Sequence, residues 1–128
     1  MNEKIVAAIV ERDGRYLITQ RRQTAIMPLL WEFPGGKVEG DEPDIAALQR
    51  ELRERLGAEF IIGRLLGEKH HRYDHNDVHI RLFAATLVSG QQITARRIND
   101  FRWVLASELG KYEFPSADEE LKQYLSPS

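Results

Sequence analysis

The sequence contains no cysteine among its 128 residues. A protein without cysteine cannot have a disulfide framework, a cysteine-ligated zinc site or a thiol nucleophile. The absence also suits a reducing compartment, and a chain of this length can bury a hydrophobic core without needing cross-links. We therefore expect residues 1–128 to form a single domain located in the cytoplasm.

Long apolar runs and an excess of charge of one sign are also missing. Near the N-terminus the longest apolar run is Ile5–Val10, which is too short to cross a bilayer, and no signal-peptide pattern precedes it. The formal net charge is −2, so the chain lacks the broad positive field of nucleic-acid-binding proteins. We expect no membrane association and no stable nucleic-acid binding. The sequence is compatible with a monomer or a homodimer.

The pattern of apolar residues predicts a mixture of strands and helices. The expected strands are Lys4–Glu11, Arg15–Arg22, Leu29–Phe33, Phe60–Leu66, Val78–Val88 and Phe101–Leu105. Asp13-Gly14 is typical of a hairpin turn, so the first two strands should be antiparallel. Gly35-Gly36 should end the third strand, and polar residues predict a loop or a hairpin end at 70–77 and a loop at 89–100.

Two helices complete the predicted α/β (α+β) domain, which places a mixed sheet between them. The first is Asp44–Leu56, where Ile45, Leu48, Leu52 and Leu56 form an apolar stripe and Glu51 and Glu54 lie on the opposite face. Gly57 suits the position after its end. The second is Ser116–Leu125, with Ser116 as N-cap and Glu119 completing a capping box.

The stretch Gly35–Gly57 contains the residues best suited to chemistry. Two glycines allow the backbone to approach a ligand closely, and Lys37 adds a positive charge beside them. Glu51 and Glu54 are three residues apart on one helix, so their oxygens could converge on Mg²⁺ or Mn²⁺ bridging to phosphates. A simpler interpretation is a solvated helix with ion pairs, because Glu51–Arg55 and Arg50–Glu54 have the i,i+4 spacing.

The spacing of this stretch closely resembles the Nudix box, G-x5-E-x7-R-E-U-x-E-E-x-G-U, where U is a bulky aliphatic residue. The matching residues are Gly36, Glu42, Arg50, Glu51, Leu52, Glu54 and Gly57, which are seven of the nine fixed positions. The preceding WEFPGGK is similar to the MutT-type branch of the family. The resemblance implies a Nudix-type α/β/α sandwich with a mixed β-sheet, in which the box forms a loop–helix–loop.

The same resemblance implies roles for individual residues. The metal ligands would be the carbonyl of Gly36 and the carboxylates of Glu51 and Glu54, with Glu51 also a candidate base for the attacking water. Arg50 and Glu42 would hold the loop and helix together. Arg21 and Lys37 would lie near the phosphates of the substrate.

Two positions correspond to the family's pocket for the nucleotide base. Phe33 follows the base-pocket position, and Asp118 ends a segment whose last residue reads the base edge. An ionised aspartate only accepts hydrogen bonds, which favours the N–H groups of cytosine, adenine or guanine. The branch with Asp here resembles cytidine-nucleotide pyrophosphohydrolases, including those that act on oxidised or methylated pyrimidines. Alternatively, Asp118 only complements the dipole of the last helix.

The sequence departs from the family pattern where two acids are expected. Arg55 replaces the second glutamate of the E-E pair, and Ala58 replaces the closing aliphatic residue. Alignment on Phe101–Trp103 places Arg97 where the MutT-type branch has a further glutamate. Arginine has no acceptor, so it cannot ligate a cation.

The resemblance implies a metal-dependent (deoxy)nucleoside triphosphate pyrophosphohydrolase that sanitises the nucleotide pool, with Mg²⁺ or Mn²⁺ as cofactor. Its reaction would give a nucleoside monophosphate and pyrophosphate, and cytidine or oxidised nucleotides are candidate substrates. The alternative is a Nudix-fold module that binds nucleotides or phosphates with little or no turnover, because Arg55 and Arg97 replace the expected acids.

Overall fold

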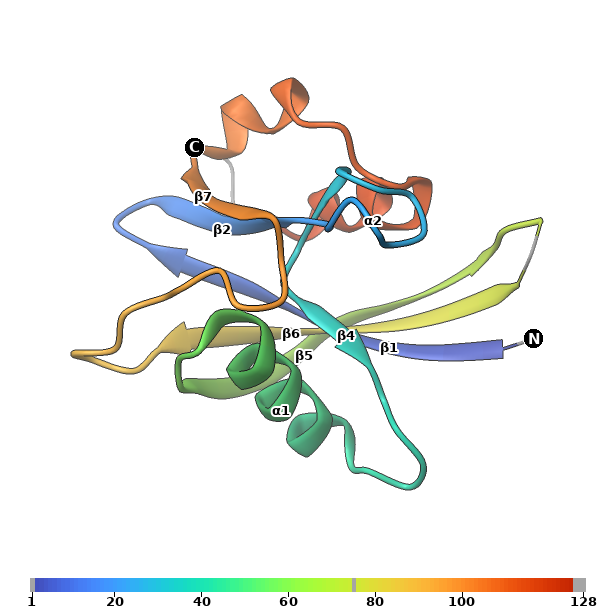
Figure 1. Ribbon diagram of the computed structural model, residues 1–128, viewed down its shortest axis with the longest axis horizontal. Coiled ribbons are helices and arrows are strands. Elements are labelled where there is room, and N and C mark those ends of the chain that lie inside the picture. Colours follow the sequence, from blue (N-terminus) through green and yellow to red (C-terminus); the bar gives the residue numbers. More distant parts are fainter. Residues whose placement is uncertain (1, 75, 126–128) are drawn as a thin grey trace.

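The computed structural model describes residues 2–74 and 76–125 of the chain (Figure 1). The strands are β1 (Asn2–Arg12), β2 (Arg15–Gln20), β3 (Trp31–Glu32), β4 (Gly35–Lys37), β5 (Phe60–Arg72), β6 (Asp77–Leu87) and β7 (Asp100–Val104). The helices are α1 (Asp44–Leu56) and α2 (Ser116–Leu121), and the 3₁₀ segments are η1 (Ala106–Lys111) and η2 (Lys122–Tyr124). None of the helices in this described part is long and apolar enough to cross a membrane.

The strands form a mixed sheet, as predicted. Its main order is β3-β2-β1-β6-β5, with β4 paired to β1 and β7 paired to β2. β1 runs parallel to β6, whereas β1–β2, β1–β4, β2–β7 and β5–β6 are antiparallel. The Asp13-Gly14 hairpin turn is confirmed, because both residues have positive φ, 53° and 77°.

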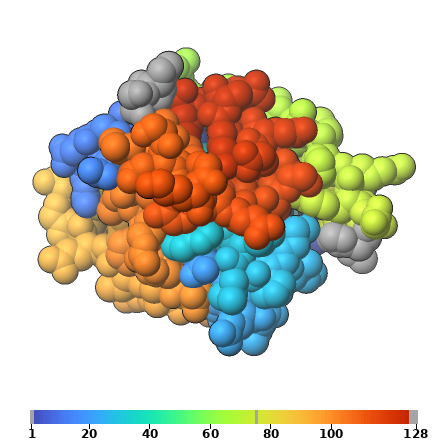
Figure 2. Space-filling model, turned by 90° about the horizontal axis from the view of Figure 1, so that it is seen from above, coloured from blue at the N-terminus to red at the C-terminus, as the bar shows by residue number. Residues whose placement is uncertain are grey.

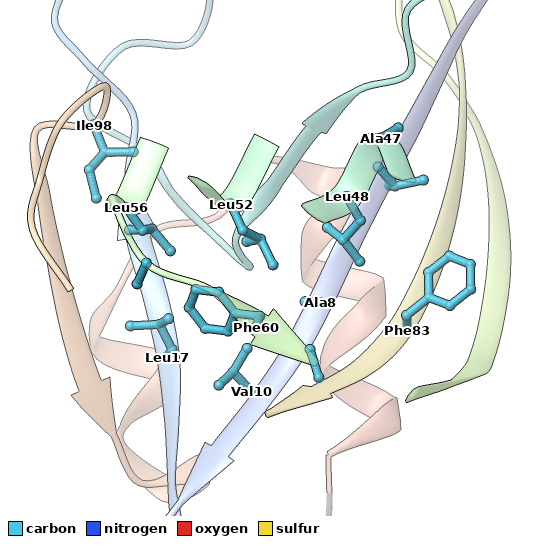
Figure 3. Packing of buried hydrophobic residues seen from close by; sticks show 13 residues of the cluster. Ala8, Val10, Leu17, Ala47, Leu48, Leu52, Leu56, Phe60, Phe83 and Ile98 are labelled. Carbon is cyan, nitrogen blue, oxygen red and sulfur yellow. The ribbon is translucent and has the colours of Figure 1, made fainter. Parts of the chain in front are cut away.

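Helix α1 covers one side of the sheet, and α2 with the 3₁₀ segments covers the other (Figure 1). Leu48, Leu52 and Leu56 of α1 are fully buried against Val10 and Phe60. Figure 3 shows these leucines directed toward the strands. A second cluster on the other side includes Phe33, Phe114 and Leu121. The result is the α/β/α sandwich that the sequence predicted.

The predicted bounds of α1 are confirmed, and Gly57 follows the helix with φ +63°. The predicted apolar stripe is partly wrong. Ala47 and Glu51 are buried in α1, while Ile45 is 45% exposed. Ile45 lies on the same face of the helix as Leu52 and Leu56, but it is in the first turn, at the end of the helix, where the side chain remains partly exposed. Glu51 therefore does not lie on a solvated face.

The Gly35-Gly36 pair continues the sheet instead of stopping it. Gly35–Lys37 forms β4 and pairs with Ile5–Ala7 of β1. A Cβ at Gly35 would lie 2.0 Å from the carbonyl oxygen of Val6, so only glycine permits this close approach. The glycines thus place the residues that precede α1 beside the centre of the sheet.

The polar stretch 70–77, predicted as a loop or a hairpin end, belongs to the end of the β5–β6 hairpin. His70–Arg72 extend β5 and pair with Asp77–His79 of β6; His75, also in this stretch, lies outside the described residues. Polar side chains on both strands gave no hydrophobic alternation, although the backbones pair regularly.

The capping prediction at Ser116 was also wrong. α2 has no side-chain cap, and the Ser116 hydroxyl bonds Nε2 of His71 at 3.0 Å instead. The α-helix ends at Leu121 and continues as a 3₁₀ turn.

Candidate active site

The site begins where α1 lies against β4. A Cβ at Gly36 would meet Oε2 of Glu51 at 1.9 Å, so the glycine leaves space for this carboxylate against the strand. Glu51 is 6% exposed and is one of two buried polar or charged residues in the described core. A buried carboxylate is costly unless it is hydrogen-bonded, so its partners define the site.

Arg50 connects the loop before α1 to the helix itself. Its Nε and Nη2 donate to the two carboxylate oxygens of Glu42 at 2.8 and 2.9 Å, and Nη2 also donates to the carbonyl of Lys37 at 3.0 Å. Nη1 donates to Glu51 at 2.9 Å and to Glu54 at 3.2 Å. Such bidentate, charge-assisted bonds fix geometry as well as energy.

This network changes the acidity of its members. The hydrogen bond from Arg50, followed by the backbone N–H of Glu39, lowers the pKa of Glu42 to about 2. In return the bond to Glu42 raises the pKa of Arg50 above its ordinary value. The loop and helix are thus joined by an ion pair that stays charged at neutral pH, which is the arrangement expected for these two residues.

Arg55 and Arg97 lie at the same site, beside the two helix carboxylates. Nε of Arg55 donates to Oε2 of Glu51 at 2.7 Å, and its Nη1 is 3.9 Å from Oε2 of Glu32. Nη1 of Arg97 is 3.7 Å from Oε2 of Glu54. Both oxygens of Glu51 therefore face a guanidinium group, Arg50 on one and Arg55 on the other.

The residues present fit one divalent cation. Among the described residues there is no group of three or more His, Cys, Asp or Glu side chains that could hold a metal ion. Glu51 and Glu54 nevertheless converge, sharing Nη1 of Arg50, and Glu51 reaches Gly36. Mg²⁺ needs only one or two carboxylates, since water and substrate phosphates complete its shell. Arg55 occupies Oε2 of Glu51, so this oxygen is available only when Arg55 moves away.

A larger cavity of about 490 Å³ opens beside this centre. Its polar wall includes Arg21, Glu32, Lys37 and Asp118. Its apolar wall includes Ile5, Ile26, Met27, Val78, Ile80 and Pro115. Figure 2 shows the C-terminal segment (red) bordering the blue loop before β3 and the yellow-green β5–β6 hairpin. An apolar cavity with a few polar groups is the usual form of a small-molecule site.

Asp118 lies on the wall of this cavity with an unusual protonation equilibrium. Burial, followed by the nearby charge of Glu32, raises the pKa of Asp118 well above its ordinary value. Arg21 and the backbone N–H of Phe33 act in the opposite direction. The neutral carboxyl, which can donate as well as accept, therefore persists to higher pH than in an exposed aspartate. The sequence-based expectation of an acceptor-only side chain applies only above this raised pKa.

The other residues expected to bind substrate are differently placed. Arg21 lines both the larger cavity and a smaller cleft of about 210 Å³ that Glu51 and Glu54 also line. Its Nε donates to the carbonyl of Ile26 at 2.7 Å and its Nη1 to Glu32 at 2.9 Å. Lys37 also lines the larger cavity and pairs with Glu3 at 2.7 Å. Phe33 is 2% exposed, packs edge-on against Phe114 in the core and does not line the larger cavity.

Sequence reasoning missed Glu32 and the residues of the β5–β6 hairpin. Glu32 lies between Arg21 and Arg55, and its charge acts on Asp118. The only sign in the sequence that Glu32 has a functional role is that it is a single acid between the apolar residues Trp31 and Phe33. The Tyr73 hydroxyl accepts a hydrogen bond from the Ala117 N–H at 3.1 Å, and Tyr73 lines the larger cavity. No spacing rule could locate it, because it reaches the site only through strand pairing.

Comparison with known proteins identifies the class to which this fold and site belong. A family model described as NUDIX domain matches residues 5–124, so the chain belongs to the Nudix family. The chain is 36% identical over 115 residues to the CTP pyrophosphohydrolase of Escherichia coli (strain K12), covering 90% of this chain and 84% of that protein.

Two further comparisons agree with this assignment. The chain is 28% identical over 117 residues to the 8-oxo-dGTP diphosphatase of Buchnera aphidicola subsp. Schizaphis graminum (strain Sg), covering 91% of this chain and 88% of that protein. The crystal structure of the MutT NUDIX hydrolase from Burkholderia pseudomallei superposes with a TM-score of 0.86 at 24% identity, covering 98% of this chain and 99% of that one. That likeness concerns the fold.

Proposed function

We propose that this chain is a nucleoside triphosphate pyrophosphohydrolase, which converts a (deoxy)nucleoside triphosphate into the monophosphate and pyrophosphate. The observation that carries the proposal is the Arg50 network. One guanidinium holds Glu42, Glu51 and Glu54 together beside Gly36, next to a cavity of about 490 Å³. Membership of the Nudix family and the names of the relatives support the same reaction.

The chemistry is mainly positioning and electrostatic stabilisation. We assign Glu51, Glu54 and the Gly36 carbonyl as the groups that hold Mg²⁺ or Mn²⁺. When bound, such a cation neutralises phosphate charge and makes a water molecule more acidic. Glu51 accepts a proton from the attacking water, and Arg50 fixes the direction of both carboxylates. Arg21 and Lys37 place positive charge along the wall where the phosphate chain enters.

The base of the nucleotide occupies the larger cavity in this proposal, with Asp118 at its edge. A neutral Asp118 can donate to a ring nitrogen and accept from an amino group, whereas an ionised one only accepts. The ionised form favours a base with an exocyclic amino group, whereas the neutral form can also pair with the N3–H and O4 of uracil or thymine. Relatives named for CTP and for 8-oxo-dGTP direct the search toward cytidine and oxidised guanine nucleotides.

The proposal extends to the setting of the enzyme. We infer that residues 1–128 act as one Nudix domain, since the family model extends over residues 5–124. We place it in the cytoplasm, in keeping with the absence of cysteine, and expect it to act as a monomer or homodimer on small nucleotides.

The test is a panel of ribo- and deoxynucleoside triphosphates that includes 8-oxo-dGTP and is assayed for pyrophosphate. We expect release from amino-bearing bases in Mg²⁺ or Mn²⁺ and none in EDTA. The matched pair of variants is Glu51→Gln, which should abolish release, and Glu59→Gln, which alters an exposed glutamate paired with Arg53 outside the site. Absence of release from every nucleotide with either metal would overturn the proposal.

A further inference from the structure

The cleft over α1 carries more positive than negative charge. Its volume is about 210 Å³, and its charged lining consists of Arg21, Arg22, Arg55 and Arg97 with Glu39, Glu51 and Glu54. Four arginines thus face three glutamates in the site where the family pattern calls for an excess of acids. A cleft with this balance attracts an anion without help from a cation.

Two of these arginines have donors available for a ligand. Arg97 is 63% exposed in its side chain, and its ion pair with Glu54 is long, at 3.7 Å. Arg22 is exposed, and within the described residues it makes no ion pair. Arg21, by contrast, donates from Nε to the carbonyl of Ile26 and from Nη1 to the carboxylate of Glu32. The cleft therefore has guanidinium groups whose hydrogen-bonding capacity the fold itself does not use.

Arg55 is the residue that links anion binding to cation binding. Its Nε bonds Oε2 of Glu51 at 2.7 Å, while its Nη1 points to Glu32, 3.9 Å away. A third of its side chain is exposed, so it can turn toward the cleft. Whenever it bonds a ligand instead, Oε2 of Glu51 loses a cationic partner and becomes able to ligate a metal.

We propose that Arg55 and Arg97 bind the polyphosphate chain of the substrate directly, without a divalent cation, and that Arg55 leaves Glu51 to do so. Planar guanidinium groups match phosphate oxygens in paired hydrogen bonds. Free Arg55 competes with the cation for Glu51, and polyphosphate removes that competition. Binding of the two ligands is therefore coupled: the polyphosphate strengthens cation binding, and by linkage the cation strengthens polyphosphate binding. The identity of the ligand as a polyphosphate rests on the proposed function.

The test uses inorganic tripolyphosphate and Mn²⁺ as probes of the complete chain. Calorimetry in EDTA measures tripolyphosphate binding to wild type, Arg55→Gln, Arg55→Lys, Arg97→Gln and the control Arg53→Gln. Arg53 lies on the same helix but outside the cleft, where its Nε is 2.7 Å from Oε2 of Glu59. Arg53→Gln changes the net charge by the same amount as Arg55→Gln, so it controls for charge. Electron paramagnetic resonance measures Mn²⁺ affinity with and without tripolyphosphate. Circular dichroism establishes that each variant is folded.

We expect tripolyphosphate to bind wild type in EDTA. Arg55→Gln should weaken this binding about tenfold, Arg97→Gln roughly threefold because it is more exposed, and Arg53→Gln by less than about twofold. Arg55→Lys should fall between wild type and Arg55→Gln. Without phosphate, Arg55→Gln should bind Mn²⁺ several-fold more tightly than wild type. These opposite effects of one substitution are not expected of a merely structural arginine.

The inference is overturned if tripolyphosphate does not bind in EDTA, if Arg55→Gln behaves like Arg53→Gln, or if Mn²⁺ affinity does not rise in Arg55→Gln. Nucleotide hydrolysis in Mg²⁺, measured on the same preparations, separates this result from the proposed function. If the protein hydrolyses nucleotides but does not bind tripolyphosphate in EDTA, the inference about the arginines is overturned and the proposed function stands. Cation-free binding without hydrolysis supports that role and overturns the proposed reaction.

Discussion

Glu42 has a hydrogen bond from Arg50 on each carboxylate oxygen, and its pKa falls from 4.5 to about 2. Because the folded-state pKa is lower than the unfolded one, the unfolded chain binds the extra proton first as the pH falls. The ion pair therefore contributes stability that is complete above about pH 4.5 and is lost as the pH falls toward 2.

We expect Glu42→Gln to lower the unfolding free energy at pH 7, and to cost much less at pH 3. Urea denaturation of both proteins at several pH values measures this difference. Glu113→Gln serves as the control, because Glu113 is exposed and has no ion pair among the described residues. A destabilisation by Glu42→Gln that is equally large at pH 3 would contradict the role of the ion pair.

Asp118 should show the opposite pH dependence. Its pKa is raised, mainly by burial, so the folded chain holds a proton that the unfolded chain has already lost above its ordinary pKa. The stability contributed by this residue therefore falls as the pH rises between the two values. Asp118→Asn cannot ionise, so its advantage over wild type in unfolding free energy should grow as the pH rises above about 4, the ordinary pKa of an aspartate. Parallel stability curves for the two proteins would show that Asp118 is not held neutral.

At the scale of elements, the two adjacent glycines of β4 have different roles: Gly35 is needed for the fold, and Gly36 is needed for the site. A Cβ at Gly35 would meet backbone atoms of β1, which cannot move without breaking the strand pairing. A Cβ at Gly36 would meet the end of the Glu51 side chain, 1.9 Å away. The first clash opposes the fold, and the second displaces a carboxylate of the site.

Gly35→Ala should therefore lower the unfolding free energy by roughly 2 kcal/mol or more. Gly36→Ala should cost less stability but reduce kcat/KM on the order of a hundredfold, since small displacements of catalytic groups have effects of that size. Thermal unfolding and pyrophosphate release measure the two properties. Equal losses of both in the two variants would refute this division of roles.

Elements whose signal lies within one segment were predictable from the sequence. α1 is amphipathic and ends at a glycine, so its bounds follow from local rules, and the Arg50–Glu42 pair lies within one loop and helix. β4 and the end of β5 were not predictable. Gly35–Lys37 has no strand-forming residues, and it becomes a strand only because β1 lies beside it. Extension of β5 to Arg72 likewise depends on its pairing with β6.

The same distinction applies to the site. The positions of Glu51 and Glu54 follow from helical spacing, whereas the burial of Glu51 depends on Gly36 from another element. Glu32 could not be assigned a role, because its partners Arg21 and Arg55 come from β2's end and from α1. Contacts between distant segments decide these roles, and no single segment contains their signal.

At the scale of the whole molecule, the sheet brings two functional regions together from its opposite sides. α1 supplies the carboxylates of Glu51 and Glu54 on one side, and α2 supplies Asp118 on the other. Arg21 lines both cavities and so lies between the two regions. A nucleotide of the proposed class would span the two, with its phosphates over α1 and its base beside α2.

Phosphorus NMR of the products formed from CTP in Mg²⁺ tests the central claim most directly, with wild type, Glu51→Gln and Glu59→Gln compared. The arrangement predicts CMP and pyrophosphate from wild type and from Glu59→Gln, and a rate lower by on the order of a hundredfold or more in Glu51→Gln. Formation of CDP and phosphate, or undiminished turnover by Glu51→Gln, would contradict the account.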